Sequence, residues 1–234
     1  MIYYQELAER LEAVRERIRV AEARCGRAPG SVTLLAVSKA VAAEQIRACH
    51  GLGQHAFGEN YLQEALQKIE ATQGLPLAWH FIGPLQSNKC RRVAQHFAWA
   101  HTIDRLKVAR RLSELRPAGA PALNVCIEVN LSGETSKHGV DVAELWALAA
   151  AVAALPALRL RGLMTVPAAS ASPDAQRHPF RRLCQLQESL RERGLALDTL
   201  SMGMSGDLEA AIAEGATLVR VGTAIFGPRP TGGG

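Results

Sequence analysis

Residues 32–39 read Val-Thr-Leu-Leu-Ala-Val-Ser-Lys, a short apolar run that ends at an amine. A run this short and this rich in Val and Leu predicts a strand covered on both faces, as in parallel sheets and α/β barrels. Lys39 would then emerge at the carboxyl end of the strand, where barrels collect their reactive groups. A lysine that loses hydration has a lowered pKa, and its neutral amine can attack an aldehyde. Taken alone, the strand favours a simpler interpretation, in which Lys39 only reaches solvent.

Short apolar runs alternate with helical patterns along the rest of the chain. The eight predicted strands are residues 32–38, 55–58, 78–83, 99–103, 122–130, 158–166, 199–202 and 217–221. The helical patterns between them are residues 43–51, 60–72, 87–97, 104–116, 142–155, 176–193 and 205–214. Because each parallel crossover needs a covering helix, the alternation predicts an α/β fold with a single (β/α)8 TIM barrel. A doubly wound open sheet is the alternative that this pattern leaves open.

An amphipathic helix is predicted ahead of the first strand, over residues 3–25. Apolar residues recur there at spacings of four, three and four from Leu7 onward, with Arg and Glu between them. Gly26 and Pro29 end this pattern. The chain is thus expected to have three parts: an N-terminal helix packed on the barrel (1–30), the barrel (31–230) and a short tail (231–234).

One segment inside the expected barrel departs from the helix and strand patterns. Residues 167–179 are rich in Ser, Ala and Pro and follow the sixth predicted strand. This composition indicates a mobile loop rather than a linker between domains.

The composition is that of one ordered domain, since 48% of the 234 residues are hydrophobic and 21% are charged. No stretch approaches the roughly 18 uninterrupted apolar residues of a membrane span. The charged N-terminus lacks the apolar core of a secretory signal. The five cysteines lie far apart and include no Cys-x-x-Cys pair, which indicates reduced thiols in a cytoplasm.

The formal net charge of +5 raises the question of a nucleic-acid partner. The arginines, however, occur as scattered pairs interspersed with Glu, and no aromatic residues lie between them to stack on bases. We therefore expect solvated helix faces, with no nucleic-acid or membrane partner. Lysine is scarce, so few positions could form a Schiff base: Lys39, Lys68, Lys89, Lys107 and Lys137.

Two neighbouring segments have the features of a phosphate site. In residues 201–207, two glycines allow backbone amides to approach an anion, and Ser205 can cap the following helix. Residues 220–223 then place Gly222 and Thr223 at the end of the last strand. Each segment alone is typical of an ordinary turn or cap. Barrels often bind phosphate with the loops after strands seven and eight, so the two together predict a phosphate site.

Other motifs for chemistry are weak or missing. The segment from Gly83 to Lys89 lacks the Gly-Lys-Ser/Thr of a nucleotide-binding loop, and the chain has no His-Glu-x-x-His or Gly-x-Ser-x-Gly motif. His80 lies in an apolar run and is more typical of a hydrogen-bonded core histidine than of a metal ligand or base.

An amine after the first strand and a phosphate site after the last two describe a site for a phosphorylated aldehyde. Pyridoxal 5′-phosphate carries both groups, and its pyridine nitrogen needs a partner that sets its protonation. Arg220 lies on the last strand beside Gly222 and is placed to be that partner.

Eight motifs follow one another between residues 32 and 227: Ala36-Val37-Ser38-Lys39, Phe57-Gly58-Glu59-Asn60-Tyr61, Trp79-His80-Phe81-Ile82-Gly83-Pro84-Leu85-Gln86-Ser87-Asn88-Lys89, Val129-Asn130, Ser136-Lys137, Arg161-Gly162-Leu163-Met164, Ser201-Met202-Gly203-Met204-Ser205 and Val219-Arg220-Val221-Gly222-Thr223-Ala224-Ile225-Phe226-Gly227. Together they resemble the motifs of the pyridoxal phosphate homeostasis proteins. The resemblance implies a barrel like the N-terminal domain of alanine racemases, with pyridoxal 5′-phosphate in a Schiff base to Lys39.

The resemblance also implies roles for other residues of the site. Ser205 would hold the phosphate together with Gly222 and Thr223. Arg220 would face the pyridine nitrogen, and Asn60 would lie beside the ring. One departure from the family is Ala40-Val41-Ala42, where relatives often have Thr-Lys-Pro; it removes positive charge beside Lys39, on which a hand-over of cofactor could depend.

Members of this family are regarded as carriers and regulators of pyridoxal phosphate supply that influence amino-acid and keto-acid balance. The resemblance therefore implies a non-catalytic, cytoplasmic protein that passes cofactor to pyridoxal-phosphate-dependent apoenzymes. A racemase or related enzyme is the alternative. Racemases of this fold resemble a barrel plus a second β-domain, which completes a dimeric site and brings in a catalytic tyrosine. We expect the barrel to take up nearly the whole chain here, which favours a monomeric carrier.

Overall fold

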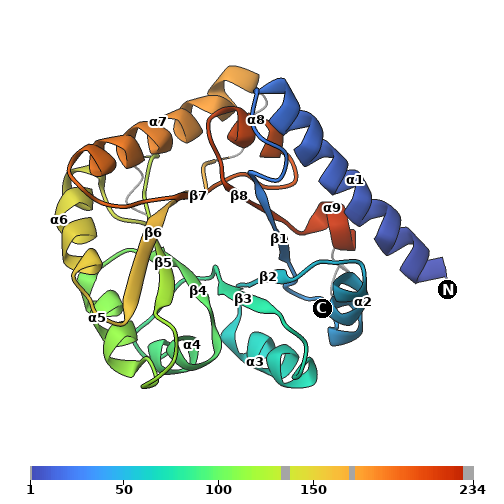
Figure 1. Cartoon of the computed structure of the whole chain (residues 1–234), viewed down its shortest axis with the longest axis horizontal. Coiled ribbons are helices and arrows are strands. Elements are labelled where there is room, and N and C mark those ends of the chain that lie inside the picture. The colour runs from blue at the N-terminus through green and yellow to red at the C-terminus, as the bar shows by residue number, and fades with distance from the viewer. Residues whose placement is uncertain (1, 133–137, 169–171, 229–234) are drawn as a thin grey trace, which may run out of the picture.

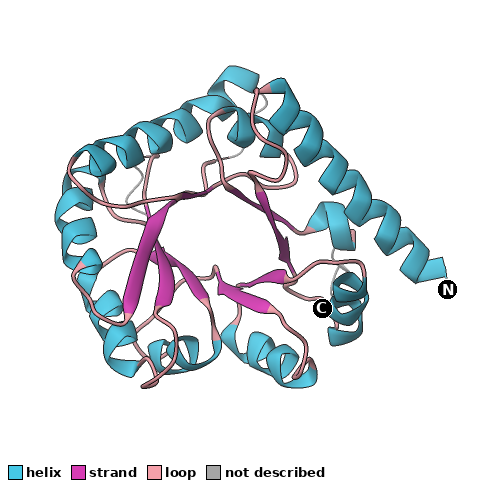
Figure 2. Ribbon diagram, in the orientation of Figure 1, coloured by secondary structure: helices cyan, strands magenta, loops and turns pink. Residues whose placement is uncertain are grey.

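The apolar runs of the sequence form the strands of a closed parallel barrel (Figures 1 and 2). The computed structural model describes residues 2–132, 138–168 and 172–228, and these residues form eight strands and nine helices. The strands are β1 (Thr33–Val37), β2 (Ala56–Glu59), β3 (Ala78–Phe81), β4 (Trp99–Ile103), β5 (Leu123–Glu128), β6 (Leu158–Met164), β7 (Thr199–Ser201) and β8 (Leu218–Val221). Each pairs in parallel with its neighbours in chain order.

Strand β1 closes the barrel because it has a partner on both sides. Ala36 pairs with Phe57 of β2 and with Val221 of β8. An open sheet would leave two edge strands with unpaired backbone groups, whereas closure removes these edges. The (β/α)8 barrel is therefore confirmed, and the open-sheet alternative is wrong.

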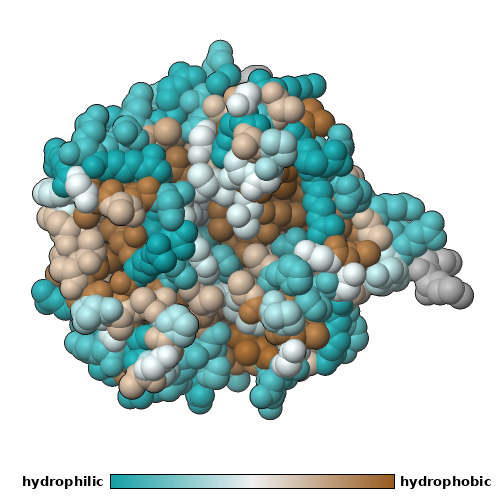
Figure 3. Space-filling view, viewed as in Figure 1, coloured by the Kyte–Doolittle hydropathy of each residue, from teal (hydrophilic) through white to brown (hydrophobic). Residues whose placement is uncertain are grey.

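Helices surround the barrel and pack their apolar faces on the strands (Figure 2). They are α1 (Ile2–Arg24), α2 (Ala43–Gly51), α3 (Leu62–Ala71), α4 (Cys90–His96), α5 (Leu106–Leu115), α6 (Val142–Ala153), α7 (Pro173–Glu192), α8 (Leu208–Ala213) and α9 (Thr223–Phe226). On α5, for example, Val108, Ala109 and Leu112 are fully buried, as amphipathic spacing requires. On the face shown in Figure 3, hydrophilic residues dominate the outer rim and hydrophobic residues lie mainly toward the centre.

Helix α1 confirms the amphipathic pattern at the start of the chain. It runs along the outside of the barrel and packs against α8 and α9 (Figure 1). Its buried side chains include those at the predicted spacing: Leu7, Leu11, Val14 and Ile18.

The carboxylate of Glu22, near the end of α1, fixes the entry of the chain into β1. It accepts hydrogen bonds from the amides of Val32 at 2.8 Å and Gly30 at 3.0 Å. Glu22 is 1% exposed and the bond to Val32 is buried, so that bond is strengthened, whereas the bond to the exposed Gly30 is only partly buried. Helix α1 and the strand that leads to Lys39 are thus tied together.

The predicted loop at residues 167–179 is partly wrong. Helix α7 begins at Pro173 and includes Pro179. Pro173 costs little at the start of the helix, because its missing N–H would have no intrahelical partner there, whereas Pro179 lies inside the helix. Phe180 and Leu183 are fully buried, and this burial outweighs the loop-like composition of the preceding residues. Residues 169–171 lie outside the described part of the chain.

Two further sequence predictions concern the ends of the chain and the membrane. The predicted tail at residues 231–234 lies outside the described residues. Within the described ranges, no helix combines the length and apolar character needed to cross a membrane.

Candidate functional site

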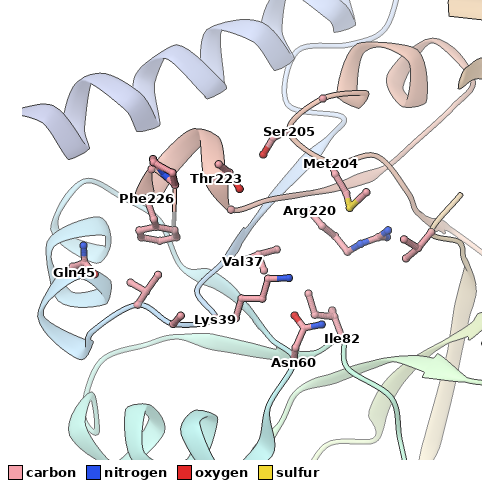
Figure 4. A pocket seen from close by; sticks show the side chains of 17 residues that line it. Val37, Lys39, Gln45, Asn60, Ile82, Met204, Ser205, Arg220, Thr223 and Phe226 are labelled. Atoms are coloured by element: carbon pink, nitrogen blue, oxygen red, sulfur yellow. The ribbon is translucent and has the colours of Figure 1, made fainter. Parts of the chain in front are cut away.

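The carboxyl ends of the strands surround a cavity of about 530 Å³ (Figure 4). All six residues that the sequence predicted for the site line this one cavity: Lys39, Asn60, Ser205, Arg220, Gly222 and Thr223. They come from segments following β1, β2 and β7, from β8 itself, and from the start of α9. Barrel closure therefore brings together residues that are distant in the sequence, such as Lys39 and Thr223, which lie 184 positions apart.

Lys39 follows β1 directly after Ser38 and is half-buried. Its side chain points into the cavity and lies between the side chains of Val37, Asn60 and Arg220 (Figure 4). The amide of Ser38 donates a hydrogen bond to the carbonyl of Gly58 at 3.0 Å, so the pairing of β1 with β2 extends to the residue before Lys39. The amine thus projects from a segment that the barrel holds in place.

Asn60 follows β2 and carries a side-chain oxygen that needs a donor. Its Oδ1 atom is buried, and no described residue donates a hydrogen bond to it. The backbone of Asn60 is held against Gly83, where an added Cβ would lie 2.1 Å from the Asn60 carbonyl oxygen. A buried polar atom without a partner is costly, so this position fits a ligand that supplies the missing hydrogen bond.

The opposite side of the cavity is formed by the turn after β7 and by α9. Gly203 adopts a positive φ of 93°, which favours glycine, and the chain then passes through Ser205. Gly222 is the N-cap of α9, and Thr223 is its first residue. Backbone amides at a helix start have no intrahelical acceptor and are suited to an anion.

The predicted helix-capping role of Ser205 is wrong. Helix α8 begins at Leu208, with Asp207 as its N-cap, three residues later than predicted. The Ser205 hydroxyl instead accepts a hydrogen bond from the amide of Ala224 in α9 at 3.4 Å. The side chains of Ser205 and Thr223 lie near each other on one side of the cavity (Figure 4). Ser205 therefore links the two loops for which the sequence predicted a shared phosphate.

Arg220 lies on β8 and is 5% exposed. Its Nη1 atom donates to the carbonyl oxygen of Ser201 at 2.5 Å and to the hydroxyl of Ser201 at 2.8 Å. Its Nη2 atom donates to the carbonyl of Thr165 at 2.8 Å. Burial lowers the pKa of Arg220 to about 10, so the guanidinium remains a cation at neutral pH. It can only donate hydrogen bonds.

A chain of buried hydrogen bonds continues from Arg220 into the barrel. The Ser201 hydroxyl is 2.8 Å from Nδ1 of His101, and Nε2 of His101 is 2.9 Å from Nδ1 of His80. Because Arg220 donates to Ser201, the serine proton is directed to His101, and His101 in turn donates to His80. The prediction that His80 is a hydrogen-bonded core histidine is confirmed.

Acid should destabilise the fold through these two histidines. Burial lowers the pKa of His80 to about 3, and burial together with His80 and Arg220 holds the pKa of His101 well below its usual value. Below pH about 6.5 the unfolded chain takes up protons at both positions and the folded chain does not, so stability falls as the pH falls. From pH 7 to 5 we expect His80 to contribute a loss of about 2 kcal/mol, and His101 to add a loss in the same direction.

Denaturant unfolding at pH 7 and pH 5 would measure this loss. The carboxyls of the buried Glu59 and the half-buried Glu128 act in the opposite direction, because loss of solvation raises their pKa values. The change in the free energy of unfolding between pH 7 and pH 5 is therefore compared between the wild type and His80→Asn. The asparagine side-chain oxygen can still accept a hydrogen bond from His101. The variant should lose about 2 kcal/mol less than the wild type over this range. An equal loss in both proteins would contradict a neutral, buried His80.

Several residues of the cavity were not predicted as site residues, although Ile82, Met204 and Phe226 lie within the motifs quoted above. They are Gln45 on α2, Ile82 after β3, Val166 after β6, Met204 after β7 and Phe226 on α9. Apolar side chains at strand ends are indistinguishable from core residues until the barrel closes. No carboxylate lines the cavity within the described part of the chain, so its charge is positive, from Lys39 and Arg220.

Comparison with known proteins gives the family of the chain. The family model described as the alanine racemase N-terminal domain matches residues 10–230. A pyridoxal phosphate homeostasis protein from Pseudomonas aeruginosa is 58% identical over 226 residues, which cover 97% of each chain. The chain belongs to the pyridoxal phosphate homeostasis protein family. Its Escherichia coli K12 relative of the same name is 54% identical over 96% of this chain and 97% of its own.

Solved structures agree with this family and with the fold. PipY of Synechococcus elongatus, solved with pyridoxal phosphate bound, is 37% identical with a TM-score of 0.83, over 94% of this chain and all of its own. Alanine racemase from Corynebacterium glutamicum has a TM-score of 0.68 at 23% identity, over 95% of this chain and 63% of its own. At that identity the racemase shares the fold, and nothing about activity follows from it.

Proposed function

We propose that this protein binds pyridoxal 5′-phosphate at the cavity and serves the homeostasis of this cofactor. The observation that carries the proposal is that Lys39, a buried arginine and a cradle of hydroxyls and amides line the same cavity. An aldehyde, a pyridine nitrogen and a phosphate require those three kinds of partner. The names of the relatives and the cofactor bound to PipY support it.

The residues that line the cavity fit the cofactor in charge and in hydrogen-bonding capacity. Two cations and no carboxylate line the described cavity, which suits an anionic phosphate ester. The buried Oδ1 of Asn60 needs a hydrogen-bond donor. Val37, Ile82 and Phe226 offer apolar surface of the kind that packs on an aromatic ring.

Each predicted residue would then have a separate task. The neutral amine of Lys39 would add to the aldehyde carbon, and loss of water would leave a C=N bond. Ser205, Gly222 and Thr223 would hold the phosphate through hydroxyl and amide donors. Arg220 would face the pyridine nitrogen, with Asn60 beside the ring. Because Arg220 is a fixed cation that only donates, the pyridine nitrogen would stay unprotonated.

We also propose that the protein carries the cofactor without turning over a substrate. When bound, the cofactor stabilises negative charge on a substrate carbon, and it does so less well with an unprotonated ring. The curated relatives that bear the homeostasis name match this chain along 97% of their length. Amino-acid racemisation in the presence of protein and cofactor should therefore not exceed the rate with free cofactor. A rate well above it that Lys39→Ala abolishes would establish a racemase instead.

The remaining expectations concern partners and location. Residues 31–230 are proposed as the cofactor-binding unit of a monomer, with pyridoxal-phosphate-dependent apoenzymes as recipients and no nucleic-acid or membrane partner. All five cysteines are free, which supports a reducing cytoplasm. Size-exclusion chromatography with light scattering would test the monomer.

An absorption spectrum before and after borohydride tests the binding proposal. Protein mixed with pyridoxal 5′-phosphate should be yellow, and borohydride should bleach it by reducing the C=N bond to a stable amine. Peptide mapping should then find the added mass on the peptide that contains Lys39. Absence of colour and of any modified peptide would overturn the proposal.

A further inference from the structure

A second lysine, Lys68, is buried beside the segment that carries Lys39. It lies on α3 and is 6% exposed. Its Nζ atom is 2.8 Å from Oε1 of Glu59, at the end of β2, and also bonds Oε1 of Glu64, one turn earlier on α3. A buried charge is stable only when it is paired and hydrogen-bonded, as Lys68 is here.

This cluster of Glu59, Glu64 and Lys68 bonds the residue before Lys39. The Ser38 hydroxyl donates to Oε1 of Glu59 at 2.6 Å. The Ser38 carbonyl accepts from Nζ of Lys68 at 2.5 Å. Both groups of Ser38 are buried, so the two bonds are protected from competition with water.

The cluster also bonds the residue after Lys39. The amide of Ala40 donates to Oε1 of Glu64 at 2.6 Å. Ala40 has a φ of 60°, the only positive value at a non-glycine position among the described residues. A side chain disfavours this left-handed conformation, so it persists only where the surroundings enforce it. Two contacts hold this exposed residue in that conformation: the turn bond from the amide of Val41 to the carbonyl of Ser38 at 3.1 Å, and the bond from its own amide to Glu64.

We propose that Glu64, with Glu59 and Lys68, positions the backbone on both sides of Lys39 for capture of the cofactor aldehyde. This inference rests on the proposed function. A lysine side chain has four rotatable bonds, and a mobile backbone would spread its amine over many positions. Anchors at Ser38 and Ala40 confine the Cα of Lys39, and with it the volume that the amine can reach. Glu59, Glu64 and Lys68 are not among the residues that line the cavity, and their bonds to Ser38 and Ala40 act on the backbone that carries Lys39.

Binding of two different ligands can distinguish a role of Glu64 in positioning Lys39 from general damage to the site. Pyridoxal 5′-phosphate has an aldehyde, whose carbon can form a C=N bond to Nζ with release of water. Pyridoxine 5′-phosphate has an alcohol at the same position and forms no such bond. It depends only on the phosphate cradle and the ring contacts. Replacing a residue that positions Lys39 should therefore weaken the binding of pyridoxal 5′-phosphate and leave the binding of pyridoxine 5′-phosphate unchanged.

The experiment compares the wild type with Glu64→Ala, Glu64→Gln and Glu70→Ala. Glu64 has 30% of its side chain exposed, so its replacement opens no sealed cavity. The Glu64→Gln variant would keep a side-chain oxygen that accepts from Ala40, and Glu70 is an exposed carboxylate on the same helix. Affinity for both ligands would be measured by calorimetry, and the rate of C=N formation by stopped-flow absorbance.

Glu64→Ala should bind pyridoxal 5′-phosphate about tenfold more weakly, as loss of one charge-assisted hydrogen bond implies. Its affinity for pyridoxine 5′-phosphate should stay within about twofold of the wild type. Glu64→Gln should recover part of the lost affinity for pyridoxal 5′-phosphate, because its oxygen still accepts from Ala40 without the charge, and Glu70→Ala should behave as the wild type toward both ligands. Equal weakening for both ligands, or none for either, would overturn the positioning role. A wild type that binds neither ligand would overturn the proposed function itself.

Discussion

Lys39→Ala should leave a colourless protein after incubation with pyridoxal 5′-phosphate and removal of the excess by gel filtration. Alanine has no amine, so the C=N bond cannot form, and only the phosphate cradle and ring contacts remain to hold the cofactor. We expect the affinity to fall about a thousandfold, equivalent to about 4 kcal/mol. Absorbance titration and equilibrium dialysis would measure the loss of the coloured species and the residual affinity.

Lys107→Ala is the matched control for this prediction. Lys107 is exposed on α5, outside the cavity, and its removal changes the net charge of the chain by the same amount. The control should keep both the colour and the affinity. Colour that persists in Lys39→Ala would show that another lysine forms the bond. Lys137, the alternative candidate from the sequence, lies outside the described residues and would be mapped next.

The barrel could be predicted because each strand carries its own signal. A strand segment buried on both faces must be apolar, as at Leu35, Ala36 and Val37 in the buried part of β1, and the intervening helices repeat apolar residues at helical spacing. The four-residue helix α9 has no such signal, because one turn is too short for periodicity to appear. The start of α7 was missed for another reason, since prolines at 173 and 179 resemble a loop in composition.

The residues of the candidate site were predictable where a residue's place on its own strand decided its position at the cavity. Lys39 and Arg220 could be found because strand ends in a barrel converge on one cavity, whatever the contacts of each side chain. Glu64 and Lys68 could not, because their roles depend on contacts with Ser38 and Ala40 that exist only after α3 packs beside β1. Sequence spacing carries no information on such contacts.

The chain of hydrogen bonds from Arg220 through Ser201 and His101 to His80 could not be predicted from the sequence, for the same reason. His101 and Ser201 lie 100 positions apart in the sequence and meet only inside the closed barrel. Two of the three groups that we propose bind the cofactor are therefore held in place by hydrogen bonds with residues outside the cavity. Lys39 is held through its backbone by the Glu59, Glu64 and Lys68 cluster, and Arg220 through its guanidinium by Ser201 and Thr165.

Arg220→Glu should both destabilise the fold and change the spectrum of the bound cofactor. The substitution removes the donors to Ser201 and Thr165 and places a carboxylate against their carbonyl oxygens. Breaking a buried, hydrogen-bonded charge of this kind costs about 3–5 kcal/mol. A carboxylate that faced the pyridine nitrogen would also hold a proton on it, so the absorption maximum should shift and its pH dependence should change.

Denaturant unfolding and a pH titration of the visible band measure the two effects, and Arg159→Glu is the control. Arg159 is exposed on β6, so its reversal makes the same change of charge outside the cavity. If Arg220→Glu does not fold, Arg220→Lys still tests the ring contact, because it keeps a cation and shortens its reach. We expect weaker binding and a shifted band in that variant. An unaltered spectrum and affinity would remove Arg220 from contact with the ring and leave it a purely structural ion that anchors β8 to β6 and β7.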